Sequence, residues 1–179
     1  MGKVGRHLVP LLLAEGARPV VADVDEQAVA RVLGEHDGVR AVGSTQELLA
    51  GELDVYSPCA LGHALTEEVA RTLRAGLVCG GANNQLATPE MAGRLADRGI
   101  LYAPDYLVNA GGVIQVEDER HGFSFARAQA KASGIFDVAL RVFQTADKEG
   151  VPPSVAADRL AEERMASVGR LSTIRLPRA

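Results

Sequence analysis

Short apolar segments alternate with amphipathic helical segments over the first 105 residues, and this alternation constrains the fold more than any other feature. The apolar segments are short and contain β-branched residues, which is typical of strands buried on both faces of a parallel sheet. A repeated strand–helix order favours a doubly wound α/β fold. The five predicted strands lie within residues 18–25, 39–43, 53–60, 77–84 and 100–105.

The pattern changes after residue 105, where NAGG interrupts the chain at residues 109–112. Apolar residues at helical spacing then predict one long amphipathic helix over residues 123–148. Pro152 and Pro153 open a second predicted helix over residues 152–168, because proline is tolerated in the first turn of a helix. The sequence therefore predicts a parallel sheet followed by two long C-terminal helices.

Composition excludes several classes of protein. The net charge is −4 and the basic residues are scattered, which argues against a nucleic-acid partner. No apolar run reaches the roughly 18 residues of a membrane-spanning helix, and the first residues do not have the regions of a signal peptide. Cys59 and Cys79 are too few and too far apart for a metal motif. We expect a cytoplasmic protein with reduced thiols and without a metal, nucleic-acid or membrane partner.

The opening residues MGKVG contain two glycines at an informative spacing. Gly2 and Gly5 are spaced like the last two glycines of G-x-G-x-x-G, the turn that receives a dinucleotide pyrophosphate. A helix that starts at Lys3 would direct its unpaired N–H groups and its positive dipole end toward such a phosphate. Taken alone, two glycines before a helix more often serve packing, so other residues must support this interpretation.

An acidic residue follows the next predicted strand, since Asp23 lies 18 residues after Gly5. This spacing suits the carboxylate that binds a ribose 2′-hydroxyl of NAD, although Asp23 alone would fit a solvated strand end. The glycines and the strand–helix alternation together favour the binding interpretation. A carboxylate there would repel a 2′-phosphate, so we expect NAD rather than NADP. Asp25 is expected to be the N-cap of the next helix.

The pyrophosphate turn normally follows a β-strand and an opening glycine, and neither precedes Gly2 in this sequence. The strand that would precede the turn is the one around which the coenzyme crevice of a doubly wound sheet is built. We therefore expect a Rossmann-type sheet that lacks its first strand. Its neighbours in the sheet are expected to have unpaired edges.

Six segments in this order resemble one enzyme family: KVGRHL, VVADVD, DVYSPCALG, CGGANNQL, APDYLVNAGG and AADRLAEER. Together they are similar to the C-terminal coenzyme-binding domain of the glutamate/leucine/phenylalanine/valine dehydrogenase family, and the resemblance runs essentially from end to end. It is closest to the leucine, phenylalanine and valine branch, and it implies an N-terminally truncated member. The family performs NAD-dependent oxidative deamination of an L-amino acid to a 2-oxo acid and ammonia.

The resemblance implies a set of cofactor-binding residues for NAD. The implied residues are Gly2, Lys3, Val4 and Gly5 at the pyrophosphate, Asp23 and Val24 at the adenosine ribose, Cys59, Ala60 and Leu61 beneath the coenzyme, and Asn83 and Asn109 beside the nicotinamide and substrate. 

Several nearby residues have more than one interpretation. Cys59 fits a plain buried thiol as well as a coenzyme contact, and Asn84 is better explained as a cap or turn residue than as a ligand. Val113 could line a substrate pocket, although a core position is the safer interpretation. His63 stands where the family commonly has glycine, and an exposed loop substitution explains it better than a general base.

The resemblance also implies that the catalytic residues are absent from this sequence. In the family, the lysines that bind the substrate carboxylate and activate the water belong to the N-terminal domain, together with a partner aspartate. The sequence has only three lysines, Lys3, Lys131 and Lys148, and the last two lie on the predicted long helix. We therefore assign no catalytic residue.

These observations lead to a division of the chain and to two functional hypotheses. Residues 1–122 are expected to form the dinucleotide-binding domain, and residues 123–179 a helical extension that would brace the absent catalytic domain. The expected function is the coenzyme-binding part of an NAD-dependent dehydrogenase for a branched-chain or aromatic amino acid, within a homo-oligomer. The alternative is a non-catalytic nucleotide-binding or subunit-interaction fragment. Without the catalytic domain to pack against, Phe136, Val142 and Phe143 are expected to be partly exposed.

Overall fold

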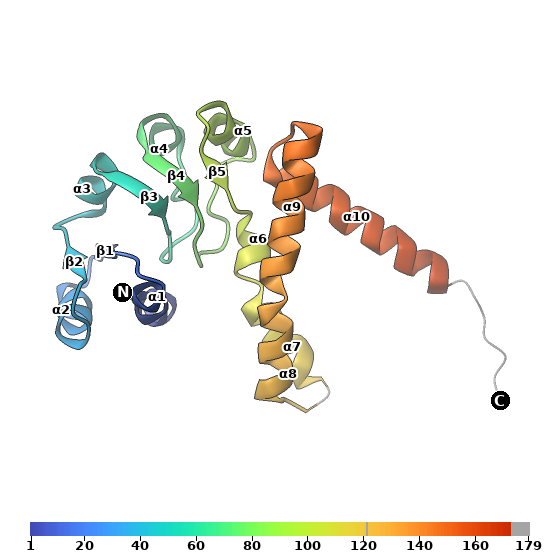
Figure 1. Cartoon of the computed structure of the whole chain (residues 1–179), viewed down its shortest axis with the longest axis horizontal. Coiled ribbons are helices and arrows are strands. Elements are labelled where there is room, and N and C mark those ends of the chain that lie inside the picture. The colour runs from blue at the N-terminus through green and yellow to red at the C-terminus, as the bar shows by residue number, and fades with distance from the viewer. Residues whose placement is uncertain (121, 173–179) are drawn as a thin grey trace.

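The computed structural model describes residues 1–120 and 122–172, which form a parallel α/β region followed by helices (Figure 1). All five predicted strands are present, although the third begins one residue and the fourth three residues before the segment in which each was expected, and every strand pair is parallel. The strands are β1 (Val20–Val21), β2 (Arg40–Ala41), β3 (Glu52–Tyr56), β4 (Arg74–Val78) and β5 (Leu101–Tyr102). The predicted α/β class is confirmed.

Helices alternate with the strands and then continue to the end of the described chain. Those of the α/β region are α1 (Lys3–Ala14), α2 (Glu26–Glu35), α3 (Thr45–Ala50), α4 (Glu67–Thr72) and α5 (Glu90–Asp97). Those that follow are α6 (Asp105–Val108), α7 (Gly111–Glu119), α8 (Phe125–Ser133), α9 (Ile135–Glu149) and α10 (Pro153–Ser172). None of these helices, within residues 1–120 and 122–172, is long and apolar enough to cross a membrane.

Polar side chains begin several of these helices. Asp25 accepts hydrogen bonds from the backbone N–H groups of Gln27 and Ala28, at 3.0 and 3.1 Å, and so caps α2 as predicted. Ser44 and Thr66 cap α3 and α4 in the same way. Each cap supplies an acceptor for backbone donors that have no partner within the helix.

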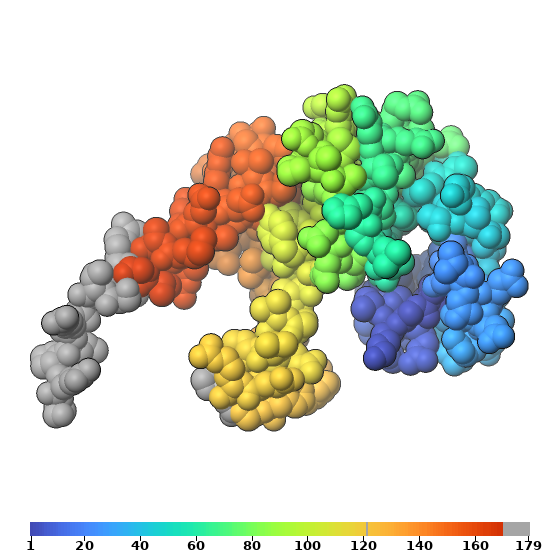
Figure 2. Space-filling model, turned by 180° about the vertical axis from the view of Figure 1, so that it is seen from behind, coloured from blue at the N-terminus to red at the C-terminus, as the bar shows by residue number. Residues whose placement is uncertain are grey.

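The five strands are divided between two sheets rather than joined in one. β1 pairs with β2, and β4 lies between β3 and β5. Among the described residues, β1 has no strand on its other side and β3 has none on the side away from β4. Figure 1 shows β1 and β3 as the neighbouring strands of the two sheets, and Figure 2 shows an opening between the blue amino-terminal segments and the cyan-to-green segments. This division agrees with a sheet that lacks its first strand.

The hydrogen bonds show which backbone groups point toward this opening. The carbonyls of Pro19 and Val21 accept N–H groups from β2 and its flank, so the peptide group of Val20 points the other way. On β3, the carbonyl of Tyr56 accepts the N–H of Cys79, so Val55 presents its polar backbone groups on the opposite edge. The side chain of Val55 remains 48% exposed. Both strands therefore carry an open edge.

Each sheet has its own hydrophobic core. The core of the three-stranded sheet contains ten buried residues from its strands and from α4, α5 and the adjoining loops, among them Leu65, Leu73, Val78 and Leu95. The core of the two-stranded sheet contains only three buried residues, which are Val9, Val21 and Val32. The larger core therefore belongs to the β3–β4–β5 sheet.

The C-terminal helices differ from the prediction in one respect. The single helix expected over residues 123–148 is divided at Gly134 into α8 and α9, while α9 and α10 are the two long helices. Val142 was expected to be partly exposed but is buried against Ala146, Ala156 and Ala157, where α9 packs on α10, so that expectation was wrong. Phe143 is half-buried, and Phe136 is 72% exposed as expected.

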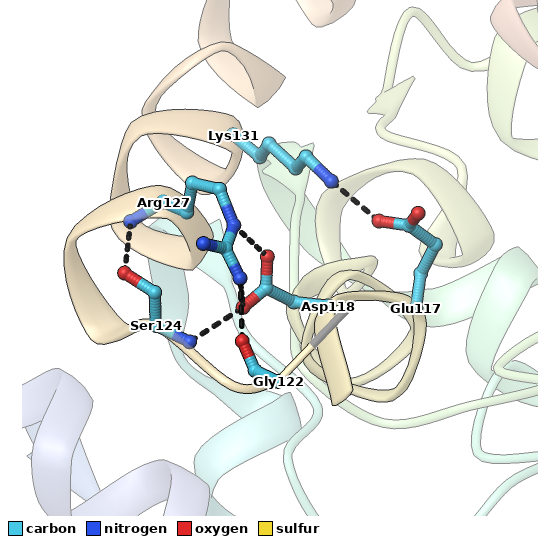
Figure 3. A network of polar contacts seen from close by, with 6 residues as sticks. All are labelled: Glu117, Asp118, Gly122, Ser124, Arg127 and Lys131. Carbon is cyan, nitrogen blue, oxygen red and sulfur yellow. Dashed lines mark hydrogen bonds and ion pairs between the residues drawn. The ribbon is translucent and has the colours of Figure 1, made fainter. Parts of the chain in front are cut away.

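An ion pair between a buried carboxylate and a half-exposed guanidinium joins α7 to α8 (Figure 3). The Asp118 carboxylate is fully buried and accepts two hydrogen bonds from the Arg127 guanidinium, at 2.7 and 3.0 Å, and one from the Ser124 N–H. The Arg127 hydrogen bond, followed by that from Ser124, lowers the pKa of the Asp118 carboxyl below its ordinary value. Lys131 also pairs with Glu117 across the same two helices. The α7–α8 hairpin is therefore held mainly by polar contacts.

Candidate functional site

The start of α1 meets the loops that follow β3 and β4, at the carboxyl ends of these parallel strands. A Cβ atom on Gly5 would lie 3.7 Å from the Cβ atom of Cys59, which places the first turn of α1 against the loop after β3. Ligands of open α/β sheets bind in the crevice at this end of the strands. Two groups of predicted site residues, far apart in sequence, are thus brought together.

Two glycines in the loop after β4 allow this close approach. A Cβ atom on Gly81 would lie 2.6 Å from Cγ1 of Val4, and one on Gly80 would lie 2.3 Å from the carbonyl oxygen of Pro58. Both distances are too short for a larger residue without a local shift. The backbone of the β4 loop therefore lies directly against α1 and against the β3 loop because these positions are glycine.

The first turn of α1 has the features of an anion site. Its N-cap is Gly2, which supplies no side-chain acceptor, and the first N–H donor of the helix ladder belongs to Arg6. The backbone N–H groups of Lys3, Val4 and Gly5 therefore precede that ladder. Glycine at the cap leaves space for a ligand oxygen, and the helix dipole favours negative charge there. These residues fit a pyrophosphate group.

Asp23 lies at the carboxyl end of β1, beside the start of the chain. Its Oδ1 atom accepts the N–H of Asp25 at 3.0 Å, and Oδ2 forms an ion pair with the amino group of Met1. Burial lowers the pKa of this amino group, while the Asp25 carboxylate acts in the opposite direction. The adjacent Val24 side chain is fully exposed. The carboxylate of Asp23 thus lies next to the α1 turn, as a ribose contact would require.

The two asparagines predicted to lie beside the nicotinamide are in contact. Asn109, which follows α6, donates from Nδ2 to Oδ1 of Asn83 at 2.5 Å, and the same nitrogen lies 3.4 Å from the carbonyl oxygen of Ala82. The paired amides leave the Nδ2 group of Asn83 and the Oδ1 atom of Asn109 for other partners. A donor and an acceptor are therefore presented together, which suits either a carboxamide or a carboxylate.

Sequence reasoning missed one polar residue of this region, Gln85, which donates to the same carbonyl of Ala82 as Asn109 does. Gln85 is fully buried, and its Nε2 group donates to the carbonyls of Gly80 and Ala82 at 2.7 and 2.9 Å. Its backbone N–H donates to Asp105 at 3.3 Å, and Asp105 also accepts the hydroxyl of Tyr102 at 3.2 Å. Burial raises the pKa of the Tyr102 hydroxyl well above its ordinary value, so this hydroxyl stays a donor at neutral pH.

The remaining predicted residues lie on the surface of the same region. Ala60 and Leu61 are exposed in the β3 loop, and so is Lys3 at the start of α1. Cys59 is half-buried, and its sulfur lies 3.5 Å from the N–H of Gly81, so it is neither a core thiol nor fully accessible. 

His63 is exposed in a left-handed conformation with φ of 58°, and its Nδ1 atom lies 3.2 Å from the carbonyl of Leu86. That position is consistent with an exposed loop substitution. Asn84 also has a positive φ of 51°, which confirms that it is a turn residue. Val113 is 74% exposed in the first turn of α7, so the expectation that it belongs to the core was wrong.

Three other features of the described residues were candidates for a functional site: the Cys79 thiol, a metal cluster and a surface hollow. Burial raises the pKa of the Cys79 thiol, which keeps it protonated at neutral pH. No group of three or more His, Cys, Asp or Glu side chains within residues 1–120 and 122–172 is arranged to hold a metal ion. A hollow lies between α5 and the α9–α10 turn. Its only charged lining residues in the described part of the chain are Asp97 and Asp147, and none of the predicted site residues lines it. The sheet edge is therefore the candidate site.

Comparison with known proteins supports one family. Residues 14–168 match the family described as Glutamate/Leucine/Phenylalanine/Valine dehydrogenase. The chain is 58% identical over 167 residues to a valine dehydrogenase of Streptomyces coelicolor, which covers 93% of this chain and 46% of that protein. It is 42% identical over 168 residues to a leucine dehydrogenase of Bacillus cereus, with 94% and 45% covered. The chain thus spans about half the length of these curated relatives.

A solved structure shares the fold. The L-tryptophan dehydrogenase from Nostoc punctiforme superposes with a TM-score of 0.88 at 36% sequence identity, over 93% of this chain and 50% of that chain. The likeness covers both the α/β region and most of the C-terminal helices, because nearly the whole of this chain is included.

Proposed function

The chain belongs to the Glutamate/Leucine/Phenylalanine/Valine dehydrogenase family, and from this premise we propose that it is the coenzyme-binding, C-terminal part of an NAD-dependent L-amino-acid dehydrogenase. The observation that carries the proposal is the first turn of α1, which has a glycine cap and lies against the β3 and β4 loops at the carboxyl edge of the strands. Residues 1–122 would form the dinucleotide-binding domain, and residues 123–179 would brace the catalytic domain.

In this proposal, different residues of the site bind different parts of the coenzyme. The backbone N–H groups of Lys3, Val4 and Gly5 bind the pyrophosphate, and Gly2 leaves room for it. Asp23 accepts hydrogen bonds from the adenosine ribose, with Val24 beside it. A carboxylate at this position favours NAD over NADP, because the additional 2′-phosphate of NADP would be repelled.

The nicotinamide end lies over the loops of the three-stranded sheet. Cys59, Ala60 and Leu61 lie beneath it, and the Asn83–Asn109 pair binds the carboxamide or the substrate carboxylate. The coenzyme supplies the hydride acceptor for oxidation of the amino acid. The asparagines are neutral amides that orient groups by hydrogen bonds and do not take up a proton.

The activation of water is assigned to residues outside this chain. Such chemistry needs a base of suitable pKa, commonly a buried lysine. Lys131 is engaged with Glu117 in the α7–α8 hairpin, and Lys148 lies at the end of α9. We therefore infer that residues 1–179 alone bind NAD weakly and do not deaminate leucine, valine or phenylalanine. In the full-length context we expect a cytoplasmic homo-oligomer that acts on a branched-chain or aromatic amino acid.

A hybrid enzyme tests the proposal. The part of the Streptomyces coelicolor valine dehydrogenase that this chain does not match would be joined in front of residue 1, and deamination would be followed by NADH absorbance. We expect NAD-dependent turnover, with NAD strongly preferred over NADP. The variant Asp23→Ser should narrow this preference by at least about tenfold, because a charged contact contributes roughly 1.5–3 kcal/mol.

Asp25→Ser is the matched control, because it removes a neighbouring charge while serine preserves the cap of α2. Its ratio of NAD to NADP efficiency should stay within twofold of the parent hybrid. An unchanged ratio in Asp23→Ser would remove Asp23 from the ribose site. A hybrid that folds but uses neither coenzyme would contradict the proposed function as a whole.

A non-catalytic interaction fragment is the second candidate, favoured by the apolar surface of the C-terminal helices. Val113, Phe125 and Phe136 are each more than two-thirds exposed. Exposed apolar residues of this kind are typical of surfaces that pack against another domain or subunit. The same hybrid discriminates the two candidates, because an interaction fragment would associate without supporting turnover.

A further inference from the structure

We propose that Gln85 is a positioning residue, which fixes the Asn83–Asn109 pair in its binding geometry through the turn at residues 80–82 and through Asp105. The proposal rests on the function proposed above in one respect, since it is the coenzyme or substrate that the pair would contact. The geometry itself is a property of the described chain. Gln85 contacts two elements directly, the loop after β4 and the start of α6, and Asp105 of α6 in turn binds Tyr102 at the end of β5.

The orientation of the Gln85 amide follows from its contacts. Nε2 donates to two carbonyl oxygens, those of Gly80 and Ala82, and a flipped amide would place Oε1 against both. The backbone between these two carbonyls is the turn that lies against Val4 of α1. The side chain therefore clamps the turn that leads directly into Asn83.

The same residue is tied to the element that carries Asn109. Asp105, the first residue of α6, accepts the backbone N–H of Gln85 and the hydroxyl of Tyr102. The N–H of Asn109 in turn donates to the carbonyl of Asp105 at 2.9 Å. Gln85 thus links the Asn83 loop to α6, the helix that directly precedes Asn109.

The Oε1 atom of Gln85 indicates that the contribution of this side chain to stability does not by itself explain why position 85 is a glutamine. Oε1 is buried and has no hydrogen-bond partner among the described residues. A buried acceptor without a partner is unfavourable, and an apolar residue of similar length would avoid that cost. The chain instead retains an amide whose two donors are fully used on one turn. Glutamine at position 85 therefore contributes more to fixing the turn at residues 80–82 than to packing the core.

Selective labelling of asparagine gives a direct test, because the sequence contains only Asn83, Asn84 and Asn109. With ¹⁵N-asparagine, the chain has three side-chain amides to observe by NMR, and Asn84 serves as the internal reference. In the unaltered chain, the Asn109 amide proton bound to Asn83 should exchange slowly with water. In Gln85→Met its exchange should accelerate at least about tenfold, while the Asn84 signals stay in place.

Two further variants keep the test decisive. Gln129→Met places the same substitution at an exposed position of α8 and should leave the Asn109 signal unchanged. Tyr102→Phe removes only the hydroxyl that donates to Asp105, and should change the Asn109 signal in the same direction by a smaller factor. It covers the case in which Gln85→Met does not fold.

The hybrid enzyme described above supplies a kinetic measurement. Gln85→Met should raise the KM for NAD by about tenfold, the equivalent of losing one well-formed hydrogen bond, while Gln129→Met stays within twofold. If the hybrid does not use NAD, the proposed function fails and the amide signals still decide the role of Gln85. An Asn109 signal that is the same in Gln85→Met, Tyr102→Phe and the unaltered chain would overturn the positioning role.

Discussion

The two parallel sheets of this molecule arise from the same strand–helix pattern but differ in strand length and in the size of their hydrophobic cores. In the β3–β4–β5 sheet, β3 and β4 are each five residues long, and its core contains ten buried residues. In the β1–β2 sheet both strands have two residues, and three buried valines make up the core. The helix that covers β1 also contains Pro10, which has no N–H to donate to Arg6.

The difference teaches that a two-stranded parallel unit depends on its neighbours. Parallel strands are normally buried on both faces and flanked on both sides. β1 has a partner on one side only, and its core residues come from α1, α2 and β1 alone. The β1–β2 unit carries Asp23, and the larger unit carries Asn83 and Asn109. The candidate site therefore combines residues from one sheet with a large hydrophobic core and from one sheet with a small core.

The largest expected effect comes from a strand placed between the two sheets. A six-residue apolar, β-branched segment ending in glycine, added directly before Met1, should pair with the open edges of β1 and β3. We expect a gain on the order of 3 kcal/mol in the free energy of unfolding. Five newly buried side chains contribute roughly 1.5–3 kcal/mol each, against an ordering cost of about 1–2 kcal/mol per residue. Urea denaturation followed by circular dichroism measures the change.

The control is the same segment with proline at its second and fourth positions. Proline has no N–H and cannot donate to a strand ladder, so this version should leave the stability unchanged. Equal stabilisation by both segments would show that the gain does not come from strand pairing. The contrast between the two sheets would then have another cause.

A pair of identical substitutions compares the two cores next. Val78 in β4 and Val21 in β1 are both buried strand valines, and each belongs to the core of its own sheet. Val78→Ala should cost about 2 kcal/mol of global stability, from two lost methyl groups and the cavity they leave. Val21→Ala should cost less than half of this, because β1 unfolds locally before the larger sheet does.

Native-state hydrogen exchange distinguishes local from global unfolding in these variants. In Val21→Ala, faster exchange should be confined to residues of α1, α2, β1 and β2. In Val78→Ala it should extend over both sheets. Equal global costs would mean that the two halves unfold as one unit, and the comparison would no longer hold.

The sequence predicted the elements of the fold better than their association. The five strands, the capping role of Asp25 and the turn at Asn84 were all visible, because each depends on residues close together in the chain. The separation into two sheets depends on which strands are present to pair, so only the absence of a strand before Gly2 indicated it. Periodicity identifies strands without specifying all of their partners.

Two polar residues explain why the site and the hairpin were only partly predictable. Gln85 is buried through contacts with Asp105, twenty residues away, and no local pattern marks a glutamine for burial. Asp118 lies in the charged run EDER, which resembles a solvated helix face, but Arg127 binds it in a fully buried position. Gly134 divides the predicted long helix, although the apolar periodicity continues across it. Contacts between residues nine and twenty positions apart decided the first two cases.

Ligand binding offers a third comparison of the two halves, with an expected effect near 1.4 kcal/mol, or tenfold. ADP-ribose has the adenosine and pyrophosphate of NAD but no nicotinamide. In the hybrid enzyme, Asp23→Ser should weaken binding of both ADP-ribose and NAD about tenfold by calorimetry. Asn83→Ala should weaken NAD by a similar factor through lost hydrogen bonds and leave ADP-ribose unchanged. Equal effects of Asn83→Ala on both ligands would place Asn83 away from the nicotinamide.

The smallest expected effect compares one helix cap from each half. Asp25 begins α2 beside the small core, and Thr66 begins α4 beside the large one, where its hydroxyl accepts the N–H of Val69 at 3.2 Å. Loss of an N-cap costs about 1 kcal/mol in a helix that unfolds together with its domain. Thr66→Ala should therefore lower global stability by about this amount. Asp25→Ala should instead accelerate hydrogen exchange in α2 and leave the urea midpoint of the larger sheet in place. If Asp25→Ala shifts that midpoint as far as Thr66→Ala does, then α2 unfolds with the larger sheet and the β1–β2 unit is not the weaker half.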